Sequence, residues 1–157
     1  MREKALLSIY DPHHERLTAA VDEILREYGE CLIIDGHSFC NDLSVGANLP
    51  DFCIGADDYH TPERLIETAY SQIEDSGYSV AINYPYSGAI VPIKHYRTEK
   101  RVISLMLEVN KGLYLKDGTM EKSDGFQKIK QLCDRIIREL VDCNRERNFV
   151  MKKIRSM

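Results

Sequence analysis

The spacing of apolar side chains predicts three helices along the chain. Leucine, valine, isoleucine and tyrosine recur every three or four residues between positions 17 and 28, which is the period of a helix with one buried face. Asp11 and Pro12 precede this stretch as an N-cap and a first-turn proline would, and Gly29 follows it. The same period returns over residues 61–77, which open with Thr-Pro-Glu, and over residues 124–144.

Three shorter apolar runs predict buried strands. They are residues 31–35 (CLIID), 78–83 (YSVAIN) and 102–109 (VISLMLEV), and the last should be a central strand because it is the most apolar. Residues 36–60 have no clear period and are rich in Gly, Asn, Asp and Ser, so we expect a long loop there. The basic tail, residues 144–157, either continues the last helix or frays.

This order of elements predicts an α/β fold with a mixed β-sheet flanked by helices, formed by a single domain over residues 1–157. Ligands of such sheets gather at the carboxyl ends of strands. Two ionisable residues are expected there. His37 should follow the first strand, and Glu108 should lie near the end of the most apolar strand.

Composition and charge narrow the range of possible functions and partners. With 43% hydrophobic and 29% charged residues, the chain is typical of a soluble globular protein, and no apolar run approaches the roughly 20 residues of a membrane span. A net charge of −4 argues against nucleic acid as the partner, and binding through the basic residues 145–155 is the weakest alternative. Five scattered cysteines and the lack of a secretory signal predict free thiols and a cytoplasmic location.

The segment Asp35-Gly36-His37 has the pattern of a metal ligand with an orienting carboxylate. Alternate residues of an extended chain point to the same side, so Asp35 can hold the His37 ring by a hydrogen bond while His37 binds a metal. In the alternative interpretation, His37 bonds only to the loop and Asp35 caps a turn.

Glu108 interrupts an apolar run, where a carboxylate is costly unless it is paired or poised for proton transfer. Burial would raise its pKa toward the working range of a general base. An ion-paired or edge-facing glutamate is the alternative.

Other polar residues are candidates for substrate binding. Asn83 and Tyr86 follow a strand and could contact a polar substrate, or they could belong to a surface turn. His95 could bind an anionic group, although its basic neighbours favour a solvated loop. His60 and Glu63 have a zinc-ligand spacing, but Glu63 is better explained as the acidic first turn of a helix.

Five segments in order resemble the N-formylglutamate amidohydrolase family, which is similar in fold to zinc carboxypeptidases and aspartoacylases. The matching segments are YDPHHERL (10–17), LIIDGHS (32–38), LPDFCIG (49–55), YSVAINYPYSGAIVPIKHY (78–96) and VISLMLEVNKGLYL (102–115). The resemblance implies zinc-dependent hydrolysis of an N-acyl amino acid such as N-formyl-L-glutamate. His37 would be a zinc ligand, Glu108 would be the general base and acid, and three residues would face the substrate: Asn83, Tyr86 and His95.

The resemblance covers only the C-terminal catalytic half of the family. The other zinc ligands lie upstream in the family, beginning with a P-H-S-G motif, and nothing before Tyr10 matches that motif. We therefore expect self-association, or a partner that covers the missing N-terminal part. The alternative function is a truncated or degenerate, non-catalytic binding domain.

Overall fold

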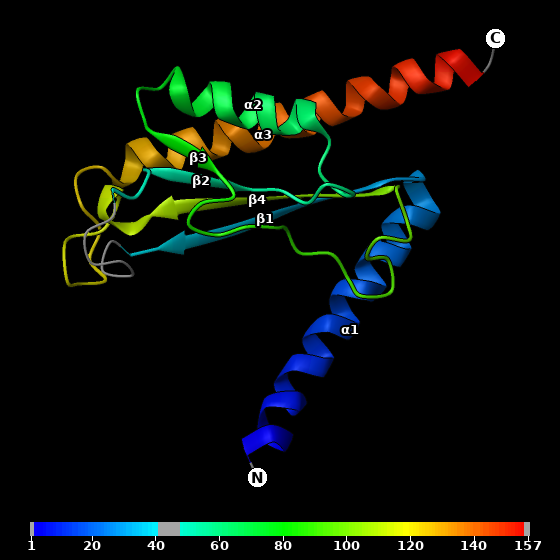
Figure 1. Cartoon of the computed structure of the whole chain (residues 1–157), viewed down its shortest axis with the longest axis horizontal. Helices are drawn as coiled ribbons and strands as arrows, with labels where there is room; N and C mark the ends of the chain where they lie inside the picture. Colours follow the sequence, from blue (N-terminus) through cyan, green and yellow to red (C-terminus); the bar gives the residue numbers. More distant parts are fainter. Residues whose placement is uncertain (1, 41–47, 156–157) are drawn as a thin grey trace.

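The computed structural model describes residues 2–40 and 48–155, and it describes side chains for residues 6–40 and 48–145. Three α-helices, four strands and one short 3₁₀ helix (η2) lie in these ranges (Figure 1). Their order is α1 (Arg2–Tyr28), β1 (Cys31–Phe39), β2 (Phe52–Gly55), α2 (Glu63–Glu74), β3 (Val80–Ile82), β4 (Val102–Asn110), η2 (Lys111–Leu113) and α3 (Phe126–Arg155).

The strands form one mixed sheet in the order β1-β4-β2-β3. Strand β4 pairs in parallel with β1 and antiparallel with β2, and β2 pairs in parallel with β3. All nine residues of β4 are buried, as its mostly apolar pattern predicts. The predicted α/β fold, with a mixed sheet flanked by helices and Val102–Asn110 as an inner strand, is confirmed.

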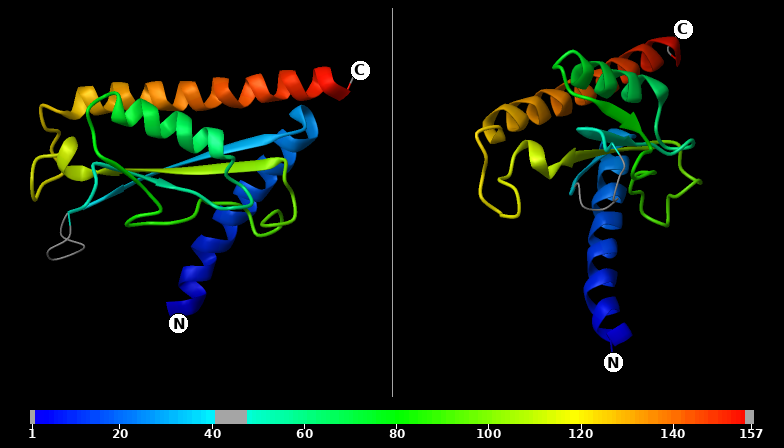
Figure 2. Two further views of the ribbon diagram at one scale, coloured as in Figure 1. Left: turned by 45° about the horizontal axis from the view of Figure 1, so that its top comes forward. Right: turned by 60° about the vertical axis from the view of Figure 1, so that its left-hand side comes forward.

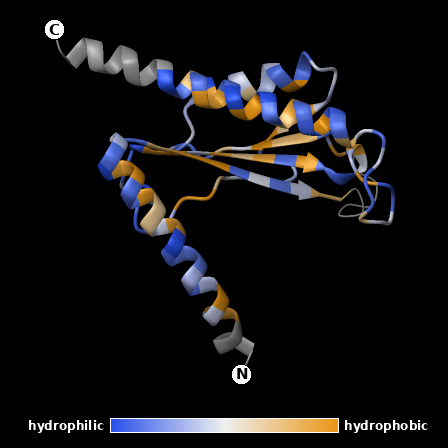
Figure 3. Cartoon of the chain, turned by 180° about the vertical axis from the view of Figure 1, so that it is seen from behind, coloured by the Kyte–Doolittle hydropathy of each residue, from blue (hydrophilic) through white to orange (hydrophobic). Residues whose placement is uncertain are grey.

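Helices α2 and α3 cover one face of the sheet (Figures 1 and 2). The main core lies between them and the sheet, where Leu105 of β4, Leu65 of α2 and Ile136 of α3 are fully buried. Polar and apolar residues alternate along α3 (Figure 3), because only one side of this helix contacts the sheet and α2. These contacts bury one face of the sheet in the main core. The polar residues of the candidate site lie on its other face.

Helix α1 contacts that other face only near its C-terminal end, where Val21 packs with Cys31 and Val102. Its N-terminal half projects away from the sheet (Figure 1), and Ile9 is 74% exposed. The predicted helix start at Asp11 is wrong, because α1 begins at Arg2 and contains Pro12 in its interior. The fixed φ of proline is compatible with a helix, so Pro12 removes one donor without ending α1.

Two other sequence predictions are wrong. Strand β1 continues to Phe39 instead of ending at Asp35, because β4 pairs with it along all nine residues. The expected loop over residues 36–60 therefore contains the end of β1 and the whole of β2, a four-residue strand that pairs on both sides. Short strands like this are set by pairing with neighbours, which a local pattern does not show.

The remaining helices and strands agree with the prediction from the sequence, apart from the residues at which they begin and end. Strand β3 keeps three of the six residues expected, and α3 begins at Phe126 and continues through the basic segment to Arg155. All five cysteines are free thiols, as expected. Within the described part of the chain, no helix has the length and apolar character needed to cross a bilayer.

Candidate active site

His37 and Glu108 lie side by side on neighbouring strands. The register of the parallel pair β1–β4 sets His37 directly opposite Glu108. Adjacent strands are about 4.8 Å apart, and register partners point to the same face of a sheet. His37 was expected beyond the end of its strand, and that position is wrong, because it lies within β1. The sheet register, rather than a loop, therefore brings the two residues together.

Asp35 holds the His37 ring. The Nε2 atom of His37 lies 2.8 Å from the Oδ1 atom of Asp35, two residues earlier on the same side of β1. A neutral imidazole that donates from Nε2 keeps its lone pair on Nδ1, and a metal binds such a lone pair. The His37 side chain is 53% exposed, so Nδ1 is accessible to a ligand or to another polypeptide.

Glu108 is buried without a full set of partners. Its residue is 6% exposed, and within the described part of the chain its Oε2 atom has no hydrogen-bond partner. Burial raises the pKa of Glu108, and nearby Asp35 raises it further, while His37 and Lys111 act in the opposite direction. A buried carboxyl group with a raised pKa and one free oxygen is suited to accepting and returning a proton.

The loop from Asn83 to Gly88 covers this part of the sheet. The Oδ1 atom of Asn83 accepts hydrogen bonds from the backbone N–H groups of Ala56 (2.8 Å) and Gly88 (3.2 Å). Asn83 itself has a left-handed backbone with φ of 55°. Its amide oxygen thus fixes the loop against the end of β2, and its predicted contact with substrate stays a prediction.

Tyr86 lies above the site in the same loop. Its carbonyl oxygen accepts a hydrogen bond from the Cys53 thiol at 3.2 Å, and its ring packs against Phe39 with centroids 6.1 Å apart. Cys53 is the antiparallel register partner of Glu108, so it lies beside the carboxylate on the β2 side. Cys53 was not predicted as part of the site from the sequence. The short apolar run of four residues that contains it could have indicated a buried strand there. The role of Tyr86 in substrate binding remains a prediction.

His95 lies in a different environment. Its Nε2 atom is 2.8 Å from Oδ1 of Asp22 on α1, and Lys94 also contacts Asp22. Lys94 and His95 lower the pKa of the Asp22 carboxyl group by hydrogen bonding to it. The described contacts of His95 are therefore with α1 rather than with His37 or Glu108, and its proposed contact with substrate is untested.

His60 has a structural environment. Its Nδ1 atom lies 2.8 Å from the carbonyl oxygen of Val102, and its Nε2 atom accepts the backbone N–H of Arg97 at 2.8 Å. Both ring nitrogens are used, and the residue is 1% exposed. Glu63 begins α2, as the alternative explanation of the His60–Glu63 spacing requires. Among the described side chains, no three His, Cys, Asp or Glu residues are grouped to hold a metal ion.

Solved structures share this fold. N-formylglutamate amidohydrolase from Ralstonia eutropha JMP134 superposes with a TM-score of 0.71 at 27% identity, over 88% of this chain and 53% of that chain. The gene product Atu2144 from Agrobacterium tumefaciens superposes with a TM-score of 0.59 at 17% identity, over 86% of this chain and 52% of that chain. The chain thus spans about half the length of these structures. The chain therefore shares its fold with part of a known hydrolase.

The family model described as N-formylglutamate amidohydrolase matches residues 1–115. The chain belongs to the N-formylglutamate amidohydrolase family. No curated protein matches it.

Proposed function

We propose that this chain provides the general base and one zinc ligand of an amidohydrolase that acts on an N-acyl amino acid such as N-formyl-L-glutamate. One observation carries the proposal. The buried Oε2 atom of Glu108 has no hydrogen-bond partner among the described residues, and Glu108 lies on the strand next to His37, whose Nε2 atom is held by Asp35. Membership of the family supports the reaction class.

The donors present fit part of a zinc site. Imidazole nitrogen is a preferred zinc ligand, and a carboxylate on the other ring nitrogen is its usual orienting partner. His37 and Asp35 have this arrangement at 2.8 Å. A catalytic zinc site takes about three protein ligands, so the described side chains supply one ligand of such a set.

Glu108 would move protons at its Oε2 atom. When bound, zinc lowers the pKa of its water toward neutrality and polarises the amide carbonyl. The Glu108 carboxylate would accept the proton of the attacking water and then donate it to the leaving amine. Burial raises the pKa of Glu108, which makes its carboxylate a better proton acceptor.

The covering loop would orient the substrate. Tyr86 lies over the sheet beside Cys53 and Phe39, on the face that carries Glu108. Asn83 keeps this loop in place through its two backbone contacts. In this proposal Asn83, Tyr86 and His95 contact the polar groups of the N-acyl amino acid, and Tyr86 has the most direct support because of its position.

A non-catalytic binding domain is the second candidate. The chain covers 53% of the Ralstonia eutropha enzyme, and its described residues hold no three-ligand metal group. Such a domain would bind the N-acyl amino acid against Tyr86 and Glu108 without hydrolysing it.

Zinc binding and turnover separate the two candidates. When the remaining zinc ligands of the site are supplied, we expect zinc to bind with a dependence on His37, and hydrolysis of N-formyl-L-glutamate to disappear in Glu108→Gln. Glu99→Gln is the matched control, since Glu99 pairs with Arg101 on the surface. If no zinc binds under saturating supply and no turnover is seen, the enzyme hypothesis is refuted. Calorimetric binding of intact N-formyl-L-glutamate would then support the binding domain.

A further inference from the structure

Lys111 is a half-buried lysine just beyond the strand that carries Glu108. Strand β4 ends at Asn110, and Lys111 begins the 3₁₀ helix η2. The ammonium group of Lys111 has no ion pair or hydrogen bond among the described residues. Removing water from a charge costs free energy unless an opposite charge takes its place. Lys111 is therefore suited to binding an anion.

The backbone of Lys111 is held in one position. The Oδ1 atom of Asn110 accepts the backbone N–H of Gly112 at 3.0 Å, which closes the turn after β4. The carbonyl oxygen of Lys111 accepts the N–H groups of Tyr114 and Leu115, at 3.1 and 2.9 Å. The side chain thus starts from an ordered turn at the carboxyl end of β4. Groups on rigid elements recognise a ligand more precisely than groups on loose loops do.

A recess of about 680 Å³ lies at this end of the sheet. Lys111 and Gly112 border it after β4, and Cys40 borders it after β1. Glu108 lies three residues before Lys111, and His37 lies three residues before Cys40, which is a separation of about 10 Å along each strand. A substrate whose amide lies at Glu108 could therefore extend its far end toward Lys111.

An acidic substrate needs a positive charge near Glu108. Glu108 and the nearby Asp35 are both carboxylates, so they would repel a substrate that carries further carboxylates. Lys111 lies close enough to Glu108 for its positive charge to lower the pKa of that carboxyl group. The same charge would attract a substrate carboxylate in the neighbouring recess.

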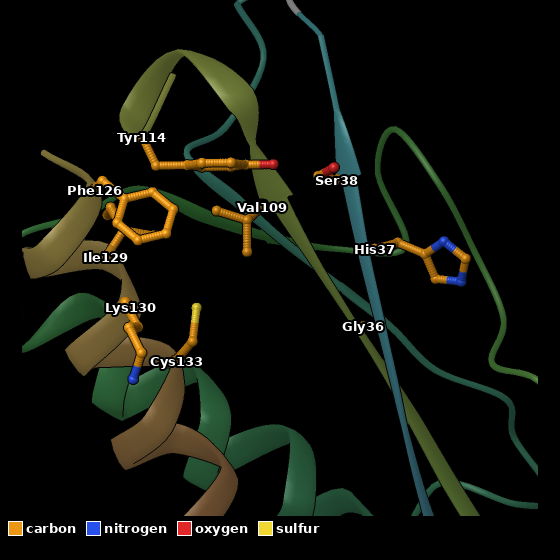
Figure 4. A pocket seen from close by; sticks show the side chains of 9 residues that line it. All are labelled: Gly36, His37, Ser38, Val109, Tyr114, Phe126, Ile129, Lys130 and Cys133. Carbon is orange, nitrogen blue, oxygen red and sulfur yellow. The ribbon is translucent and has the colours of Figure 1, made fainter. Parts of the chain in front are cut away.

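A second recess lies on the other face of the sheet and does not serve this purpose. It has a volume of about 500 Å³ and opens between the end of β1 and α3, with apolar walls that include Val109 and Phe126 (Figure 4). The His37 ring points to the opposite side of β1 (Figure 4). Lys130 borders this recess but is already paired with Asp134. The recess at Lys111 is therefore the better candidate for the acidic end of a substrate.

We propose that Lys111 is the specificity-determining residue that binds the side-chain carboxylate of an N-acyl acidic amino acid. The inference rests on the proposed function, because that function places the amide of the substrate at Glu108. The α-carboxylate of such a substrate lies beside the amide, whereas the side-chain carboxylate of glutamate lies further along the molecule. The position of Lys111 beyond the end of β4 fits the more distant group.

Calorimetric titration with two ligands of the same shape tests this role. N-formyl-L-glutamate carries the side-chain carboxylate, and N-formyl-L-glutamine has a neutral amide in its place. We expect the full chain, with zinc present, to bind N-formyl-L-glutamate about 10–100-fold more tightly, because hydrogen bonds to charged groups are the stronger ones. Lys111→Met has a side chain of similar length without the charge, and it should bind the two ligands with equal affinity.

Two further variants serve as controls. Lys111→Arg keeps the positive charge and should retain the preference for N-formyl-L-glutamate. Lys116 borders the same recess, but it is paired with Glu121 at 2.8 Å, so Lys116→Met should also retain the preference. If Lys111→Met does not fold, Lys111→Gln replaces it, and the comparison of the two ligands on the unchanged chain needs no variant.

Three results would overturn the inference. They are equal affinity of the unchanged chain for the two ligands, binding of neither ligand, and a preference that persists in Lys111→Met or is lost equally in Lys116→Met.

Other outcomes separate the inference from the proposed function. A preference that depends on Lys111, without any turnover, would support the inference and refute hydrolysis. Turnover of both ligands with equal kcat/KM, unchanged in Lys111→Met, would support the proposed function and overturn the inference.

Discussion

Replacing Glu108 by glutamine should make the folded chain more stable at neutral pH. Glu108 is 6% exposed as a residue, and its Oε2 atom has no partner in the described structure, so the folded state leaves a buried carboxylate oxygen desolvated. An unsatisfied buried polar atom costs about 1–3 kcal/mol, and a charged one costs more. Glutamine has the same shape and also leaves a polar group without a partner there, but it removes the charge. We therefore expect the difference between a charged and a neutral buried group, about 1–3 kcal/mol, as a gain in the free energy of unfolding.

The pH dependence of this gain has a defined sign. Burial raises the pKa of folded Glu108 above its ordinary value of 4.5. As pH rises, the unfolded chain therefore releases this proton first, and the folded state loses stability between the unfolded and the folded pKa. The advantage of Glu108→Gln should be absent below the ordinary value, grow through that interval and remain constant above it.

Thermal unfolding followed by circular dichroism, in the presence of a chelator, measures the effect. For a chain of this length each kcal/mol is about 2–4 °C, so the melting temperature at pH 8 should rise by roughly 2–12 °C. Glu99→Gln is the control with the opposite sign, because hydrogen bonds from Arg101 lower the pKa of Glu99 to about 2. The reasoning is refuted if Glu108→Gln is no more stable than the original chain at any pH.

Three further changes test other parts of the structure. Gly55→Ala would place a Cβ 2.2 Å from the Gly88 carbonyl oxygen, and urea unfolding should show a loss of about 1–3 kcal/mol; an unchanged midpoint contradicts this close contact. His60→Ala leaves the Val102 carbonyl without its partner and should cost about 2–5 kcal/mol in the same assay, with His60→Asn intermediate; equal costs would argue against the hydrogen bond. Asp35→Asn should weaken zinc affinity about 10–100-fold in calorimetric titration, and an unchanged affinity would exclude its orienting role.

Elements with a strong internal pattern could be predicted from the sequence. Strand β4 is mostly apolar because both of its faces are covered, and α2 has a clear apolar face between a proline and a glycine. Strand β2 was missed because its four residues gain their stability from pairing with β3 and β4, which are distant in sequence. The continuation of α1 through Pro12 was missed because a proline is also compatible with the start of a helix.

Candidate residues for the site could be chosen from the sequence, but their relative geometry could not be predicted. Asp35 and His37 have a spacing that places them on one side of an extended chain, and the structure shows the contact. That His37 lies opposite Glu108 depends on the register between two strands about 70 residues apart, which is set by the packing of the whole sheet. The hydrogen bonds of Asn83 to the loop also depend on how distant segments meet, so its structural role could not be deduced from the sequence.

Strand β1 should tolerate substitutions far better than insertions or deletions. Its odd-numbered side chains include His37 and lie on the face of Glu108, while its even-numbered side chains, such as Ile34, pack toward α3. Adding or removing one residue before His37 would exchange these two sets, because side chains alternate along a strand. The imidazole would then enter the apolar layer, and Leu32 and Ile34 would face the site. In related sequences that keep the function, changes in length should therefore fall outside this strand.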